Sequence, residues 1–392
     1  MTDSLRIALL LDPLVLRSKG GDHAPQLARE LLGKGHTVRS FGAPEGTIPR
    51  SGADPATEGH PAPAEAQPEG LQAFRPDVLV AYGALSPMAW WGARTSRKLK
   101  SPLVLVETGF PSRRRIHERV LRWLGERLWG KLVRKTASLV IALDPIAREQ
   151  TLRAGFPEER IQVLPAGVDL TTFRPGLSSG LIARHQIRGR VLLYVGRIEE
   201  SRGLGVLIAA FARTVGQRGD WSLVLAGEGP DRGRLRTMAD RLGVGAHVFW
   251  LGWPRSEELP GLMASSTFFV EPCLDDSVRG VHIGSALACG VPVLASERTR
   301  LRALVEPGVS GLLAASGDVP AWTEMVRRAA SSPVARRRWG DNARRVAEDR
   351  LGWPTIAGEL EETLRHVVHE AEAARVAEAA AEAKAADAKA RA

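Results

Sequence analysis

The chain has 392 residues, of which 44% are hydrophobic and 25% charged, as expected of a globular protein long enough for two domains. Its two cysteines, Cys273 and Cys289, exclude a disulfide framework and favour a reduced, cytoplasmic compartment. We expect neither a signal peptide nor a transmembrane helix, because the N-terminus lacks a cationic flank and no long apolar run follows. The net charge of +10 fits nucleic acid, anionic lipid or a phosphorylated ligand, or else an arginine-rich surface without a partner.

Short apolar runs alternate with helical patterns in the first half, which is typical of βα units around a parallel sheet. A helix is expected over about 23–33, where Gly33 and Gly35 end the pattern. Residues 44–70 are rich in Pro and Gly and are expected to form a flexible loop, and 167–180 is the expected hinge. The predicted strands are 6–11, 37–42, 77–82, 102–107, 138–143 and 161–166.

The second half repeats this alternation without repeating the sequence. The tail from Glu370 is nearly all Ala, Glu, Lys, Arg and Asp, so an exposed helix or disorder is expected there. The predicted strands are 191–196, 222–227, 247–252, 267–272 and 292–296; helices are expected to start near Leu204, Asp231, Glu258 and Val281, and to cover 321–331, 335–350 and 353–368. The fold class is therefore α/β with two Rossmann-like domains, and ligands are expected in a cleft between them, at the carboxyl ends of the strands.

The segment VGRIEESRG, residues 195–203, is the strongest indication of ligand chemistry. Arg197 stands just after a predicted strand, and Arg202 precedes Gly203 at a predicted helix start. Two guanidinium groups there can hold a diphosphate through charge-assisted bonds and stabilise it as a leaving group. Ordinary surface arginines are the alternative interpretation.

Two further segments follow predicted strands. GEGPDRG, residues 227–233, has the spacing of a dinucleotide fingerprint, but the next strand ends at Leu251–Trp253 without the required acidic residue. We therefore interpret 227–233 as a tight turn. In 271–293, Gly280 precedes a helix whose first N–H groups form a typical anion site.

Taken in this order and spacing, these segments resemble the nucleotide-binding half of the family-four retaining glycosyltransferases, which have the GT-B fold. Residues 20–38 and 160–175 resemble that family's first glycine loop and interdomain link, and the likeness covers roughly 5–368. The resemblance implies an N-terminal acceptor-side domain over 1–175, a nucleotide-sugar domain over 176–350, a closing helix over 351–369 and the tail over 370–392.

The resemblance also implies roles for single residues. Arg197, Arg202 and Asp276 are the implied catalytic residues, no metal or other cofactor is implied, and the nucleotide sugar is a co-substrate. The implied donor-binding residues are Gly20, Gly21, Arg197, Arg202, Glu228, Trp253, Ser277, Gly280, Val281 and Ser285.

This sequence departs from the family at its acidic positions. The family usually has two glutamates eight positions apart, and here those positions are Ser277 and Ser285. Asp275 or Asp276 can replace the first acid if the loop is shifted, whereas Ser285 offers only a weaker neutral bond. Where the family often has an acceptor-side histidine, this chain has Glu107 nearby.

Residues 111–135 carry nine cationic and two acidic side chains, with apolar residues at helical spacing. Such a helix fits an anionic membrane surface, and the alternative is a core helix with a basic solvent face. We expect a cytoplasmic hexose-type glycosyltransferase, peripheral at the inner face of the membrane, acting on a glycan or lipid-linked acceptor. The alternatives are a GT-B-like binding protein without turnover and a nucleic-acid-binding protein; the latter lacks a recognition module, so no nucleic-acid partner is expected.

Overall fold

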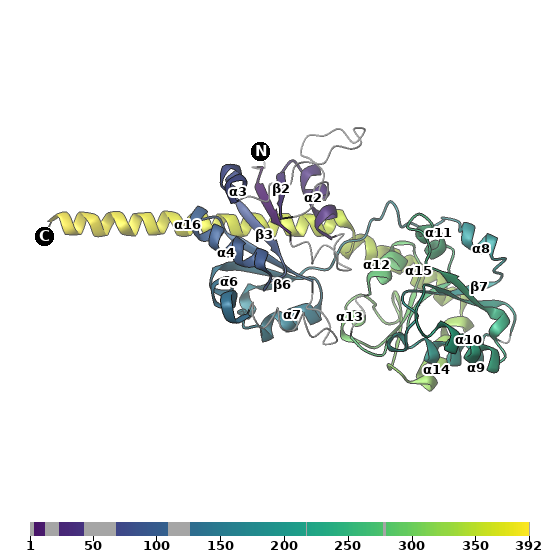
Figure 1. Ribbon diagram of the computed structural model, residues 1–392. Helices are drawn as coiled ribbons and strands as arrows, with labels where there is room; N and C mark the ends of the chain where they lie inside the picture. The colour runs from purple at the N-terminus through teal and green to yellow at the C-terminus, as the bar shows by residue number, and fades with distance from the viewer. Residues whose placement is uncertain are drawn as a thin grey trace. The chain divides into compact units, whose positions relative to one another are not determined.

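The computed structural model describes residues 4–11, 23–42, 68–108, 126–216, 218–276 and 280–391. The chain divides into two compact units, and each is described by itself: unit 1 is Met1–Ala166 with Ile356–Ala392, and unit 2 is Gly167–Thr355 (Figure 1). Gly20, Gly21, Ser277 and most of the predicted segments 44–70 and 111–135 lie outside the described residues.

Unit 1 is built on a parallel six-stranded sheet in the order β2-β1-β3-β4-β5-β6. The six strands overlap those predicted. The inner strands are short apolar runs that are largely buried in the sheet, whereas the edge strands β2 and β6 are partly exposed. They are β1 (Arg6–Leu10), β2 (Thr37–Phe41), β3 (Val78–Tyr82), β4 (Leu103–Glu107), β5 (Ala137–Ala142) and β6 (Ile161–Val163). Its described helices are α2 (His23–Gly33), α3 (Pro68–Phe74), α4 (Pro87–Leu99), the π-helical turn η1 (Glu126–Gly130), α6 (Lys131–Thr136), α7 (Pro145–Arg153) and the turn η2 (Glu158–Arg160).

Unit 2 has its own parallel six-stranded sheet, in the order β12-β11-β10-β7-β8-β9. Its strands are β7 (Arg190–Val195), β8 (Trp221–Ala226), β9 (Val248–Gly252), β10 (Phe268–Glu271), β11 (Val293–Ser296) and β12 (Gly311–Ala314), the last of which was not predicted. Its helices and turns are α8 (Gly180–Arg184), η3 (Glu200–Arg202), α9 (Leu204–Thr214), α10 (Arg232–Arg241), η4 (Gly245–His247), α11 (Leu259–Ala264), α12 (Val281–Ala288), α13 (Thr299–Arg302), α14 (Val319–Ser331) and α15 (Pro333–Arg350).

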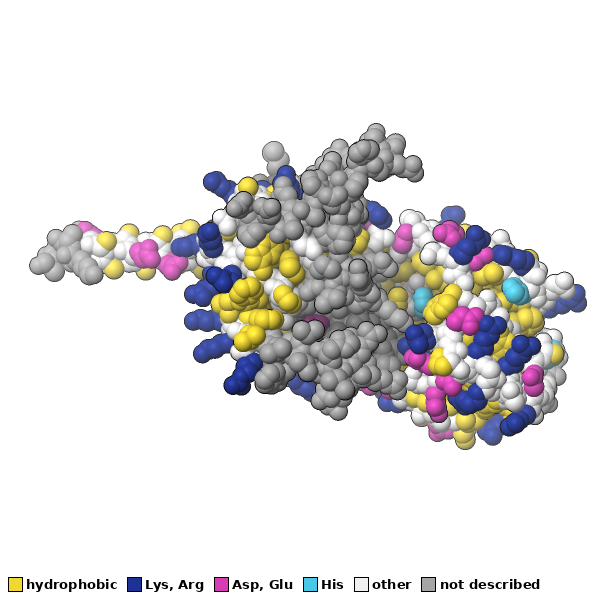
Figure 2. All heavy atoms as spheres, in the orientation of Figure 1, with side chains coloured by type: hydrophobic (Ala, Val, Ile, Leu, Met, Phe, Trp, Pro, Cys, Tyr) yellow, Lys and Arg dark blue, Asp and Glu magenta, His cyan; other side chains and the backbone are white. Residues whose placement is uncertain are grey.

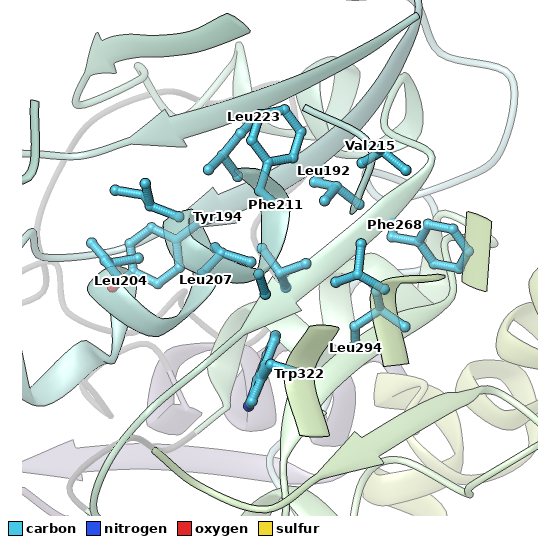
Figure 3. Packing of buried hydrophobic residues seen from close by; sticks show 14 of the residues in the cluster. Leu192, Tyr194, Leu204, Leu207, Phe211, Val215, Leu223, Phe268, Leu294 and Trp322 are labelled. Carbon is cyan, nitrogen blue, oxygen red and sulfur yellow. The ribbon is translucent and has the colours of Figure 1, made fainter. Parts of the chain in front are cut away.

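A continuous apolar core holds the helices of unit 2 against this sheet. Figure 3 shows Phe211 of α9, Phe268 of β10 and Trp322 of α14 gathered with the strand residues Leu192 and Leu223, all at most 1% exposed. Burying each such side chain contributes about 1.5–3 kcal/mol. The strand ends are therefore fixed firmly, and so are the loops that follow them.

Four helix starts share one local signature. Ser86, Asp144, Asp318 and Ser332 each accept a hydrogen bond from the amide three residues on, with Pro in the first turn. Proline suits that turn because it lacks the N–H that would otherwise be unsatisfied. Each cap stabilises its helix by about 1 kcal/mol.

The helix α16 (Trp353–Arg391) begins in unit 2 and continues in unit 1. It is longer than the predicted 353–368, and its residues from Glu370 are exposed or half-buried where side chains are described. Unit 2 begins at Gly167 and ends at Thr355. Its two ends are joined at Val168, whose amide donates to the Leu351 carbonyl and whose carbonyl accepts from the Trp353 amide. None of the helices in the described ranges combines the length and apolar content needed to cross a bilayer.

Candidate functional site

The loops after the strands of unit 2 meet at one edge of its sheet. In a parallel sheet all carboxyl ends lie on the same side, and this edge is where α/β folds bind ligands. Because β11, β10, β7 and β8 are neighbours in that order, the loops that carry the predicted site residues are adjacent.

The first loop brings Arg197 and Arg202 together around one carboxylate. The Nε atoms of both guanidinium groups lie 3.2 Å from oxygens of Glu199, on the turn η3. Arg202 is 13% exposed and Arg197 53%. Burial acts to raise the pKa of Glu199, but Arg202, Ser201 and Arg197 outweigh it and hold that pKa below its usual value. Glu199 thus holds both arginine side chains through their Nε atoms.

This loop interlocks with the one after β10. Gly203 has φ +66°, and a Cβ added to it would lie 1.8 Å from the Pro272 carbonyl oxygen. The amide of Leu274 donates to the carbonyl of Ser201 at 2.9 Å. Only glycine fits at 203, so Arg202 is placed directly against the β10 loop.

The loop after β8 packs on the other side of the arginine loop through backbone contacts. The Ile198 amide donates to the backbone carbonyl of Glu228 at 3.0 Å, and a Cβ at Gly229 would lie 2.1 Å from the Ile198 carbonyl oxygen. The Glu228 carboxylate accepts a bond from Arg232, and its side chain is 45% exposed. Trp253, after β9, is 52% exposed. Glycine in the predicted tight turn at 227–233 therefore lets the backbone of this loop approach the backbone of the arginine loop closely.

The loop after β10 is held in place by residues that the sequence reasoning missed. Arg298 donates to the Leu274 carbonyl and, at 3.0 Å, to Ser316, whose hydroxyl donates to the Cys273 carbonyl at 2.7 Å. Arg300, only 6% exposed, donates to the carbonyl of Asp276. The signal that could have found Arg298 and Arg300 is their position directly after strand β11, which lies next to β10 in the sheet.

Asp276 is half-buried, and its backbone is fixed by the bond from Arg300. Its Oδ1 atom is buried and makes no hydrogen bond within the described part of the chain. A buried carboxylate oxygen without a donor is costly, so this atom is an acceptor suited to a ligand hydroxyl.

The start of α12 completes the edge. Gly280 is its N-cap with φ +66°, and among the described residues no side chain caps the first turn. Val281 follows at 55% exposure, whereas Ser285 is only 7% exposed. The helix thus presents uncapped N–H groups at its first turn, while the hydroxyl predicted to bind the donor is buried.

A second polar group lies at the carboxyl edge of the sheet in unit 1. His23 Nδ1 lies 2.9 Å from the hydroxyl of Tyr82, and burial lowers the pKa of His23 to about 4. Glu107, 2% exposed, accepts from the Ala84 amide at 2.9 Å. Sequence reasoning singled out Glu107 but gave no role to Tyr82, at the end of β3, or to His23, at the start of α2. Because its pKa is lowered to about 4, His23 is neutral at physiological pH.

No group of three His, Cys, Asp or Glu side chains within the described ranges is arranged to hold a metal ion. Cys273 and Cys289 are both buried and unbridged. Burial raises the pKa of each thiol to about 12, so neither is a thiolate at neutral pH.

Two family models match the chain: "Glycosyl transferases group 1" over residues 183–346 and "Glycosyltransferase Family 4" over 21–172. The chain is 31% identical over 248 residues to the GDP-mannose-dependent alpha-(1-6)-phosphatidylinositol monomannoside mannosyltransferase of Mycolicibacterium smegmatis, covering 58% of this chain and 62% of that protein. It is 29% identical over 214 residues to the D-inositol 3-phosphate glycosyltransferase of Mycobacterium bovis, covering 53% of this chain and 43% of that protein. The chain thus spans between about two fifths and three fifths of the length of these relatives.

Among solved structures, HepE of Anabaena in complex with UDP matches with a TM-score of 0.68 at 20% identity, over 92% of this chain and 100% of that one. At such identity the likeness bears on fold alone. It confirms the expected class: an α/β protein with two Rossmann-like units, as in GT-B structures.

Proposed function

This chain belongs to the family-four glycosyltransferases, and from that premise we propose that it moves a hexose-type sugar from a nucleotide-sugar donor to a glycan or lipid-linked acceptor. The proposed transfer retains the anomeric configuration and needs no metal ion. The observation that supports it best is the pair Arg197 and Arg202, fixed on Glu199 at the carboxyl edge of the sheet.

The chemistry follows from where charge develops. When the bond between the sugar and the diphosphate breaks, negative charge grows on the leaving phosphate oxygens. Two positioned guanidinium groups stabilise that charge, and the uncapped first turn of α12 adds the partial positive charge of a helix start. In this proposal these groups do the work that a divalent cation does in metal-dependent transferases.

The hydroxyl groups of the donor sugar need a hydrogen-bond acceptor in the protein. We assign this to Asp276, because Arg300 fixes its backbone and its buried Oδ1 makes no bond within the described residues. Ser285 is a weaker candidate because it is 7% exposed. Glu228 and Trp253, both about half exposed, are assigned to the nucleotide part of the donor.

Donor binding tests the arginine pair. We expect the double variant Arg197→Ala, Arg202→Ala to bind nucleotide sugars about 10²–10⁴-fold more weakly, because each charged contact contributes about 1.5–3 kcal/mol. The matched control is Arg213→Ala, Arg218→Ala, two exposed arginines of unit 2 at and beyond the far end of α9. Calorimetric titration is the measurement. Equal donor affinity in both double variants would refute the site.

The choice of donors follows from the similar proteins. One is named GDP-mannose-dependent and another was solved with UDP-glucose, so these two sugars are tested first, followed by ADP-sugars. Mass spectrometry of the purified protein would identify any nucleotide that it retains.

The absence of the usual glutamates at 277 and 285 favours one alternative, a GT-B-like protein that binds the donor without turnover. Transfer or donor hydrolysis separates the two functions. Binding of a nucleotide sugar with neither reaction, across all donors tested, would establish the alternative.

We place the protein in the cytoplasm, where nucleotide sugars are made, and at the inner face of the membrane if its acceptor is lipid-linked. The basic segment 111–135 suggested this from sequence, and only its residues 126–135 are described.

A further inference from the structure

The strands of unit 2 begin at the edge of the sheet opposite to the candidate donor site. β7 begins at Arg190, β8 at Trp221 and β10 at Phe268, and Arg190 is in register with Trp221. Because β7 has six residues, each with a rise of about 3.3 Å, the two edges are about 20 Å apart. A binding site at this amino edge is therefore separate from the donor site.

Aromatic rings contact one another along the amino edge. The rings of Trp221 and Phe268 stack with their centroids 6.4 Å apart, and the ring of Trp339, on α15, lies 6.5 Å from that of Phe268. The guanidinium of Arg190 lies over the Trp221 ring, 5.6 Å from its centroid, and its Nη1 is 2.7 Å from a carboxylate oxygen of Asp220. The Arg190 side chain is 43% exposed, so this pair lies open to solvent.

Arg336 brings a second guanidinium to this edge. It stands one turn before Trp339, on the same side of α15. Its Nη1 is buried and makes no hydrogen bond within the described part of the chain. Burial lowers the pKa of Arg336, and the nearby positive charge of Arg190 lowers it further. The indole Nε1 of Trp339, a residue that is only 3% exposed, also lacks an acceptor among the described residues.

The surroundings of Arg336 differ from the rest of unit 2. On the face of this unit that Figure 2 shows, Lys and Arg side chains are interspersed with Asp and Glu side chains. The segment 327–338 instead has no acidic residue and five arginines, at 327, 328, 336, 337 and 338. A buried donor without an acceptor is costly, because bulk water does not reach it. An anion beside Arg336 would supply both the missing acceptor and the missing negative charge.

We propose that Arg190 and Arg336 bind a small tetrahedral oxyanion, either inorganic phosphate or the phosphate of a monoester, at the amino edge of the unit 2 sheet. Guanidinium groups suit such an ion, because each can donate two parallel N–H bonds to its oxygens. Ser332 already caps α15 by accepting from the Ala335 amide at 3.1 Å, so the donors are side chains rather than the helix start. The inference goes beyond the proposed function and does not depend on it.

Tryptophan indole NMR signals report the two edges separately in the full chain. Labelling with ¹⁵N gives one indole signal for each of the ten tryptophans, and the variants Trp253→Phe and Trp339→Phe assign the two that matter. We expect inorganic phosphate to shift the Trp339 signal with a Kd on the order of 1 mM, as two charged contacts predict. Sodium chloride at the same ionic strength should shift this signal much less, because it screens charge without forming the same bonds.

Two single variants test the assignment of the residues. Arg336→Gln should raise the Kd for phosphate at least about ten-fold, because it removes one charged contact. The matched control is Arg337→Gln, which makes the same change at the exposed neighbouring residue and should alter the Kd by less than about two-fold. The remaining indole signals should keep their positions in both variants, which shows that both are folded.

The source of the oxyanion is distinguished by a second titration, with a sugar monophosphate in place of inorganic phosphate. Tighter binding of the sugar monophosphate would identify a phosphorylated metabolite as the ligand, and equal or weaker binding would identify the free ion. Either result supports an oxyanion site.

Three results would overturn the proposal. These are a Trp339 signal that does not move at about 20 mM phosphate, twenty times the expected Kd, an equal Kd in Arg336→Gln and Arg337→Gln, and an equal shift by chloride. Titration with UDP and with GDP reads the proposed donor site through the Trp253 signal in the same samples. A Trp253 shift without any response of Trp339 to phosphate refutes only the amino-edge site, whereas the reverse result counts only against the proposed function.

Discussion

One carboxylate of α16 pairs with residues of unit 1 that lie outside this helix. Glu361 lies 2.8 Å from Arg365 on its own helix, 3.2 Å from Lys34 and 3.2 Å from Nε2 of the buried His36. Because His36 Nδ1 accepts the Leu5 amide, its Nε2 must carry the proton that faces Glu361. This one side chain therefore joins α16 to the chain around β1 and β2.

The substitution Glu361→Gln removes the charge and keeps the shape. Burial acts to raise the pKa of Glu361, but Arg365, Lys34 and His36 outweigh it and lower that pKa from 4.5 to about 2. Such a lowering corresponds to about 3 kcal/mol before solvent screening. Lys34 is 35% exposed and Arg365 28%, so we expect a loss of about 1–2 kcal/mol in unfolding free energy.

The lowered pKa of Glu361 also predicts how the loss of stability in Glu361→Gln changes with pH. A carboxyl whose pKa is lowered on folding stabilises the protein fully above its unfolded pKa of about 4.5. That contribution is lost as the pH falls toward about 2, the folded pKa. The difference between wild type and Glu361→Gln should thus be constant above about pH 5 and shrink below it.

Native-state hydrogen exchange of the amides of 356–368 is the assay, because it reports opening of α16 even if the two units unfold separately. The control is Glu362→Gln, whose side chain is exposed one residue further along the same helix. We expect the control to change the opening free energy by less than about 0.5 kcal/mol. A difference that is the same in both variants, or that grows with falling pH, would show that the Glu361 ion pairs do not hold the helix.

Two substitutions test the loops of unit 2. Gly203→Ala places a Cβ 1.8 Å from the Pro272 carbonyl oxygen at φ +66°, so donor affinity should fall at least about ten-fold and stability by about 2 kcal/mol or more. Gly205→Ala, in the first turn of α9, places a Cβ no nearer than 3.8 Å to Met238 and should leave both intact in the same titration and urea unfolding. Arg298→Met removes the bonds to the β10 loop and should raise KM for the donor by about ten-fold with a smaller change in kcat, whereas Arg302→Met, a 61% exposed residue paired on the surface, should change neither constant in steady-state kinetics.

Most strands could be predicted because they are short apolar runs buried on both faces, as β7 and β8 show. β12 was missed because its residues, Gly311–Ala314, begin with a glycine and lie between Gly308 and Gly317, so that the segment resembles a loop. The helix predicted over 353–368 and the exposed helix that was one of two expectations for the tail from Glu370 form the single helix α16, because the Ala-rich residues continue it by intrinsic propensity rather than by an apolar stripe.

Part of the site could be predicted because its residues follow strands directly. Arg197 follows β7 in this way, and Arg202 stands directly before Gly203, the residue that precedes α9. Glu199 could not be assigned, because only the turn η3 brings its carboxylate between two arginines that stand on either side of it in sequence. Arg298 and Arg300 act on a loop about 24 residues away, and that contact depends on β10 and β11 being neighbours in the sheet.

The distribution of charge carries more information than its sum. A net charge of +10 is compatible with a protein whose arginines are all neutralised locally and with one that concentrates its cations on a single face. In unit 2 many surface arginines pair with carboxylates, among them Arg232 with Glu228, Arg234 with Asp231, Arg255 with Glu258, Arg302 with Glu297 and Arg350 with Glu306. In unit 1 the segments 87–100 and 126–136 hold eight cations and only Glu126 as an acid, and Lys100 pairs with Glu378 of α16. Local pairing screens those arginines of unit 2 against anionic partners. The net charge of the chain therefore describes neither unit by itself.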